Sequence, residues 1–271
     1  AAMSIEQMGA VLIAFEGLSI LSLLIQKKRI PAVIWIQTAI TFVAFVILFM
    51  APGNEMRVAS EITTWMPGYK ELSVGKHLFM TIQWMLSSFA NEGKAFFIAI
   101  WTAGFLLLMK SKKAKVYQIL AVVFSVVALL PYAGISFFSE MGIGYIDIEQ
   151  RLTELPTWQT MNIQNRIAFF WWIAAVLFTM VLLWKVTGHS VFISMVFLGG
   201  IASEAVLHFS PTIYASGARV YYLTDLMYLF IILWMVMRMD SEKKKNLFIA
   251  GTAALGVINF LSQYSIMLLK L

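Results

Sequence analysis

The sequence predicts an all-α fold, a polytopic bundle of about eight transmembrane helices plus one outer interfacial helix, in a single domain over residues 1–271. Three observations lead to this prediction. Of the 271 residues, 61% are hydrophobic and only 13% are charged, whereas about a quarter of a soluble domain is charged. The apolar residues form long runs separated by polar breaks, several of them near the length of a spanning helix. The runs lack the in–out alternation of a membrane barrel strand.

The apolar runs give the predicted elements in order. Spanning helices are predicted over residues 5–25, 31–50, 95–109, 116–138, 167–184, 191–209, 217–238 and 247–269. Apolar residues also recur at helical spacing over residues 74–89. That segment is predicted to lie in the outer interface, because a crossing there would place the basic stretch 110–115 outside.

The basic residues set the predicted orientation. They cluster at residues 27–29, 110–115, 185 and 238–245, which the positive-inside rule assigns to the cytoplasm. The net charge of +6 therefore reports topology rather than nucleic-acid binding, and the absence of cysteine excludes disulfides and thiolate sites. The first cluster places the N-terminus outside without a signal peptide, so we expect the chain to be the later part of a longer protein.

Four acidic residues fall within the apolar runs, where ionisable groups indicate function by default. Glu204 and Glu6 are the candidate catalytic residues, and Asp225 is predicted two turns inside its helix. Glu16 lies near mid-membrane, where an interhelical hydrogen bond is the simpler interpretation. The alternatives are that Glu6 complements its helix dipole and that Glu204 only fixes packing with a residue on the same face, His208.

Two polar islands, residues 51–57 and 210–225, are predicted on the outer side. In the second, Ser216 is a candidate cap, Gly217 lets a ligand approach the backbone, and Arg219 suits a phosphate or carboxylate. The first island adds Asn54 and Arg57 after a predicted Pro-Gly turn. Together they would suit a lipid-linked phosphate. His208, Tyr214 and Asp225 are further candidate substrate-binding residues at this surface. The alternatives are that tyrosines such as Tyr214 form an interfacial belt and that the arginines only bind lipid headgroups.

The sequences of the two polar islands resemble those of a known protein family. APGN-x-x-R at 51–57 and SPT-x-Y-x-SG-x-R at 210–219, with Glu6-Gln7 opening a helix, resemble a family of polytopic bacterial membrane proteins related to GT-C glycosyltransferases, a group that includes serotype-converting glucosyltransferases. The motifs span most of the chain. The resemblance implies sugar transfer from a polyprenyl-phosphate donor to an extracytoplasmic cell-surface glycan or lipid acceptor, in the bacterial plasma membrane. It implies that Asn54, Arg57, Ser216 and Arg219 hold the donor phosphate.

The chain departs from the GT-C pattern at one point. These enzymes usually carry a catalytic acid in a first external loop, which would precede Ala1, so the alternative to Glu204 and Glu6 is an acid/base supplied from outside this chain. No metal-ligand spacing is evident, and a divalent metal is left open. The alternative functions are a transporter or flippase of lipid-linked glycans, which would need deep polar residues, and a non-catalytic membrane subunit, which would bind no lipid phosphate.

Overall fold

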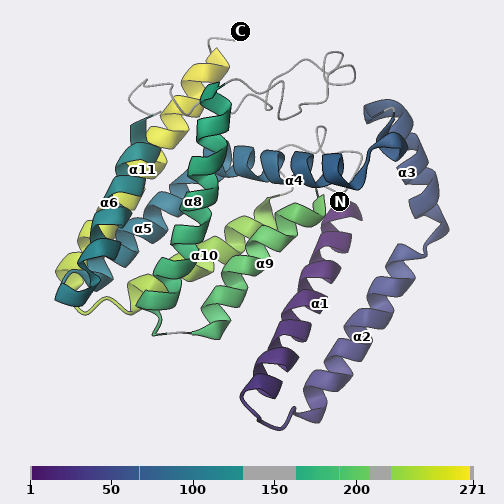
Figure 1. The fold of residues 1–271 in the computed structure, drawn as a ribbon, viewed down its shortest axis with the longest axis horizontal. Helices are drawn as coiled ribbons and strands as arrows, with labels where there is room; N and C mark the ends of the chain where they lie inside the picture. The colour runs from purple at the N-terminus through teal and green to yellow at the C-terminus, as the bar shows by residue number, and fades with distance from the viewer. Residues whose placement is uncertain (1, 67, 131–162, 189, 208–220, 269–271) are drawn as a thin grey trace. The chain divides into compact units, whose positions relative to one another are not determined.

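The computed structural model describes residues 2–66, 68–130, 163–188, 190–207 and 221–268, and all the secondary structure in these ranges is helical. The all-α prediction is confirmed for this part of the chain. The α-helices are α1 (Ala2–Ile25), α2 (Ala32–Phe49), α3 (Pro52–Trp65), α4 (Val74–Ser88), α5 (Lys94–Leu108), α6 (Lys115–Leu129), α8 (Ile163–Val186), α9 (Val191–Leu207), α10 (Tyr222–Met237) and α11 (Glu242–Leu268) (Figure 1).

Two of the described helices are long and apolar enough to cross a membrane. They are Met8–Ile25 within α1 and Arg166–Val186 within α8. Shorter apolar helices cover Ala32–Leu48, Lys94–Leu108, Val191–Val206 and Tyr222–Met237. By length and composition these two helices are candidate membrane spans, and the larger number expected from the sequence stays a prediction.

The chain divides into two compact units. The first comprises Ala1–Met85, Ile143–Thr160 and Ser194–Met227, and the second comprises Leu86–Gly142, Met161–Ile193 and Tyr228–Leu271. In the first unit, α1 and α2 form an antiparallel hairpin (Figure 1). Gly9 permits close contact in this hairpin, since a Cβ there would lie 2.8 Å from Phe45 Cδ2. Gly199 similarly lets α9 approach α1, where a Cβ would lie 3.0 Å from Phe15 Cε2.

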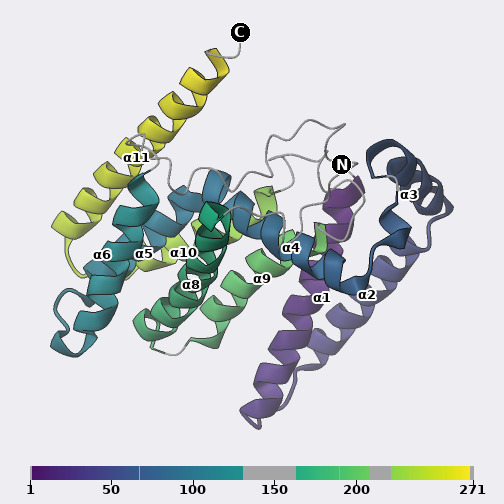
Figure 2. The ribbon, with the colours of Figure 1, turned by 45° about the horizontal axis from the view of Figure 1, so that its top comes forward.

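The second unit has an aromatic core. Phe97 and Trp101 on α5 are both 0% exposed, and the Trp101 Nε1 donates a 2.7 Å hydrogen bond to Thr179 Oγ1 on α8. The Phe97 ring lies 5.5 Å from that of Trp172 and 5.6 Å from that of Tyr228. Helix α6 runs beside α5 in both views (Figure 1 and Figure 2). The apolar runs predicted as spanning helices thus form the core of this unit.

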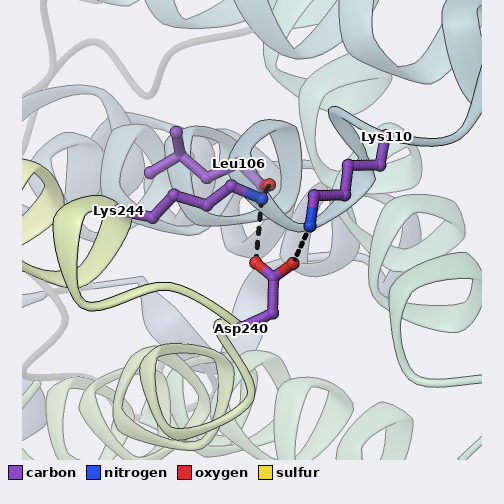
Figure 3. A network of polar contacts seen from close by, with 4 residues as sticks. All are labelled: Leu106, Lys110, Asp240 and Lys244. Carbon is purple, nitrogen blue, oxygen red and sulfur yellow. Dashed lines mark hydrogen bonds and ion pairs between the residues drawn. The ribbon is translucent and has the colours of Figure 1, made fainter.

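A polar network joins two basic links of the second unit (Figure 3). Asp240, which follows α10, accepts from Lys110 Nζ at 2.6 Å and from Lys244 Nζ at 3.0 Å. Lys244 also donates to the Leu106 carbonyl at 3.0 Å, one of the carbonyls that a helix leaves unpaired at its C-terminus. The links after α5 and α10 therefore lie side by side, as expected of two loops on one membrane face.

The first polar island differs from its prediction. Residues 51–57 do not form a turn, because Pro52 begins α3 and Ala51 is its N-cap. Proline is favoured at the first helical position, where its missing N–H leaves no hydrogen bond unmade. Glu55 in the first turn complements the positive end of the helix. The Pro-Gly pair thus starts a helix here instead of re-aiming the chain.

Three further boundaries differ. Helix α10 begins at Tyr222 rather than at residue 217. Helix α11 begins at Glu242, and the 2.6 Å ion pair between Lys245 and Glu242 stabilises its first turn. The helix predicted over residues 74–89 was expected to end at residues 91–93. The helical backbone instead continues from α4 through a short π-helix, Phe89–Gly93, directly into α5. The kink predicted at Pro131 and the short helix predicted near residues 147–155 lie outside the described residues.

Candidate functional site

The candidate site lies in the first unit, where the C-terminal half of α9 meets the start of α10. Thr224 Oγ1 on α10 donates a 3.1 Å hydrogen bond to the Gly200 carbonyl on α9. Tyr221, directly before α10, accepts a 2.9 Å hydrogen bond at its hydroxyl from Trp84 Nε1 on α4. Thr224 and Tyr221 are 1% and 6% exposed. Three segments distant in the sequence are thus held together by two side-chain hydrogen bonds.

Glu204 is the buried acid of this region. It is 3% exposed and lies one turn beyond Gly200, on the face of α9 that contacts α10. Its neighbour Ser203 is fully buried. Buried ionisable groups gather at functional sites, so Glu204 is the candidate general acid or base among the described residues. The sequence analysis placed Glu204 within about two turns of the outer end of a helix over residues 191–209, and the described helix α9 runs three residues beyond Glu204, to Leu207.

Asp225 lies in the first turn of α10, and its backbone N–H donates to the Tyr221 carbonyl at 2.9 Å. The sequence analysis placed it two turns inside the helix, which is wrong because α10 starts five residues later than predicted. At this position its carboxylate complements the helix dipole. Asp225 directly follows Thr224, the residue that contacts Gly200, so its backbone lies beside the α9–α10 contact.

Arg57 lies on α3 and forms an ion pair with Glu61, one turn further on, with 3.6 Å between Nε and Oε1. Both side chains are partly buried, at 25% and 18% exposure. A guanidinium group suits recognition of phosphate or carboxylate because of its planar set of N–H donors. Asn54 lies in the first turn of α3, and the contacts of its side chain lie outside the described part of the chain.

Several predicted site residues cannot be placed in this geometry. The backbone of Glu6 belongs to α1, but its side chain is outside the description. Residues 208–220 lie outside the described residues. They include five predicted site residues: His208, Tyr214, Ser216, Gly217 and Arg219. The anion site assigned to that island therefore stays a prediction, as does the capping role of Ser216, and α10 begins at Tyr222.

The structure adds residues of α4 that the sequence analysis missed. The predicted apolar stripe is exposed at its start, with Val74 at 75% and Leu78 at 47%, and buried at its end, with Leu86 at 2% and Phe89 at 0%. The buried side instead carries Thr81 and Gln83, at 4% and 3% exposure, next to Trp84. The signal was present as three residues capable of hydrogen bonding within four positions of one helix. It was overlooked because the sequence analysis considered only the apolar residues of this segment.

No group of three or more His, Cys, Asp or Glu residues that could hold a metal ion occurs in the described ranges. The site there consists of Glu204 and Asp225, the hydrogen-bonded Trp84–Tyr221 pair, and neutral polar groups. This set can move a proton and bind hydroxyl groups. No family model, curated protein or solved structure matches the chain.

Proposed function

We propose that this chain is a multi-pass protein of the bacterial plasma membrane that transfers a sugar from a polyprenyl-phosphate donor to an extracytoplasmic glycan or lipid acceptor. The observation that carries the proposal is the buried carboxyl group of Glu204 at the α9–α10 junction. A buried acid beside aromatic and hydroxyl groups suits the activation of a sugar or lipid hydroxyl. The resemblance of the two islands to GT-C enzymes supports the same reaction.

The distribution of charge supports a polytopic topology. Basic residues gather in or beside the links that follow α1, α5, α8 and α10, with Lys185 in the last turn of α8 and Lys243–Lys245 at the start of α11, as cytoplasmic helix ends require. Glu204 lies near the end of α9 remote from its basic link, and Asp225 lies at the corresponding end of α10. Arg57 follows the end of α2 remote from the first basic cluster. All three residues would then lie toward the extracytoplasmic side.

The proposed reaction assigns each group a role. The Glu204 carboxylate takes the proton of the acceptor hydroxyl as its oxygen bonds to the anomeric carbon of the sugar. The bond between that carbon and the phosphate oxygen breaks, and polyprenyl phosphate leaves with the bonding electrons. Arg57, and in the second island Arg219, stabilise the negative charge of the leaving phosphate.

The test is turnover of a labelled polyprenyl-phosphate sugar by the full chain in lipid nanodiscs. Glu204→Gln keeps the size of the side chain but cannot accept the proton, so kcat should fall by about 100-fold or more. Glu55→Gln, an exposed acid in the first turn of α3, is the matched control and should leave turnover unchanged. A Glu204→Gln protein that folds and turns over at the wild-type rate would remove Glu204 from the mechanism.

A transporter of lipid-linked glycans is the second candidate. The observation that favours it is Glu16, a carboxyl group that is 9% exposed near the middle of the Met8–Ile25 span. Deep ionisable residues of this kind occur in substrate and ion pathways. Such a protein would move the labelled lipid across the bilayer with its sugar still attached, whereas a transferase would separate the two.

A further inference from the structure

The hairpin of α1 and α2 contains a carboxyl group that is only half satisfied. Thr41 Oγ1 on α2 donates a 2.9 Å hydrogen bond to Glu16 Oε1 on α1. The other oxygen, Oε2, is buried and has no hydrogen-bond partner among the described residues. Buried polar atoms are almost always paired, so an unpaired one calls for an explanation such as a bound ion.

More oxygen atoms lie along the contact between α1 and α2. Thr38 stands one turn before Thr41 on α2, and its Oγ1 is also buried without a hydrogen-bond partner in the described ranges. Helices α1 and α2 run antiparallel (Figure 1). Three residues forward from Glu16 and three back from Thr41 therefore put Ser19 and Thr38 at the same level of the hairpin. Ser19 Oγ donates to the Phe15 carbonyl at 2.8 Å, which leaves its lone pairs free to accept.

The α1–α2 contact contains one acidic residue and no basic residue to neutralise it. Glu16 is the single charged residue of α1 between Met8 and Ile25, and α2 has none. An ionised carboxylate with one hydrogen bond is costly in apolar surroundings unless a positive charge neutralises it. Carboxylate and hydroxyl oxygens are hard ligands that suit hard cations. A single negative charge with neutral hydroxyls matches a monovalent ion better than a divalent one.

We propose that Glu16, Ser19, Thr38 and Thr41 form a binding site for a monovalent alkali cation inside the α1–α2 hairpin. Glu16 supplies the charge, and the hydroxyl groups of both helices supply neutral oxygens. The ion ties the two helices together near the middle of the Met8–Ile25 span. The site involves none of the residues assigned to sugar transfer, so it stands or falls separately from that activity.

The primary test is binding of ²²Na⁺ to the purified full chain in nanodiscs, with choline as the competing inert cation. Saturable binding of about one Na⁺ per chain is expected. Glu16→Gln should abolish it, and Thr41→Val should weaken it about tenfold, the equivalent of one lost hydrogen-bonding contact. Thr63→Val is the matched control, because Thr63 is an exposed residue of α3 whose hydroxyl donates to the Ala59 carbonyl, and it should bind Na⁺ normally. Absence of saturable binding, or normal binding by Glu16→Gln, would overturn the proposal.

A second measurement uses the wild-type chain alone, which avoids any folding defect of a variant. A hydrophobic carbodiimide modifies carboxyl groups within membranes, and peptide mass spectrometry locates the modified residue. Modification of Glu16 should be several-fold slower in Na⁺ than in choline at the same ionic strength. An equal rate in the two salts would show that no alkali cation occupies the carboxyl group, and a proton alone would then be its partner.

Discussion

Gly104 is the point of closest contact between α5 and α8 in the second unit, and its replacement tests how tightly these helices pack. A Cβ at position 104 would lie 2.7 Å from Leu182 Cδ2, 3.0 Å from its Cγ and 3.2 Å from its Cδ1. Leu182 is 0% exposed, so its side chain has little space into which it can rotate. Gly104→Ala must therefore push the two helices apart or force Leu182 from its rotamer.

The expected magnitude follows from two opposing terms. Overpacking a close-packed core costs about 1–3 kcal/mol. Alanine is favoured over glycine inside a helix by about 1 kcal/mol. The free energy of unfolding should therefore fall by about 1 kcal/mol for Gly104→Ala. It should fall by about 3 kcal/mol for Gly104→Val, which adds more atoms at the same contact and has a weaker helix propensity.

The assay is unfolding in mixed micelles of increasing SDS fraction, followed by tryptophan fluorescence because Trp101 lies in the same core. Gly251→Ala is the matched control on α11, since a Cβ there would meet nothing within 4 Å. That variant should be as stable as the wild type or slightly more stable. If Gly104→Ala were as stable as Gly251→Ala, the close packing of α5 against Leu182 would be refuted.

Two further predictions concern hydrogen bonds. Lys110 first, and then Lys244, lower the pKa of Asp240 from its ordinary 3.8 to about 2. The stability that Asp240 contributes is therefore fully present above about pH 4 and is lost as the pH falls through 2. The melting temperatures of the wild type and Asp240→Asn should converge over that range. A constant difference between them would contradict the Lys110–Asp240–Lys244 network. In the first unit, Trp84→Phe and Tyr221→Phe should couple by about 0.5–1.5 kcal/mol in a double-mutant cycle of unfolding, whereas additive effects would exclude their hydrogen bond.

The sequence was sufficient for the helices whose apolar runs are uninterrupted. Helices α2, α5 and α8 were predicted within four residues at each end, because burial in lipid or in the core requires such runs whatever their partners. It failed at α3, where Pro52 and Gly53 were taken as a turn. The same proline serves as a helix start, and only the residues that follow it decide between the two.

Helix α4 illustrates a different limit. Periodicity located its apolar stripe but not the direction in which the stripe points, and Val74 is exposed while Gln83 is buried. In a membrane protein an apolar face can lie toward lipid and a polar face toward the protein, the reverse of the soluble arrangement. The Trp84–Tyr221 hydrogen bond joins residues 137 positions apart, and no local pattern in the sequence specifies such a pairing.

The fate of a doubly labelled donor tests the central claim most directly. The full chain in proteoliposomes would receive a polyprenyl-phosphate sugar labelled differently in the lipid and in the sugar, together with a mixture of cell-envelope acceptors. We predict that the sugar label moves to an acceptor while the lipid label remains as polyprenyl phosphate, and that Glu204→Gln prevents this separation. If the two labels stay joined in the wild type, with or without passage across the bilayer, the chain alone does not transfer the sugar.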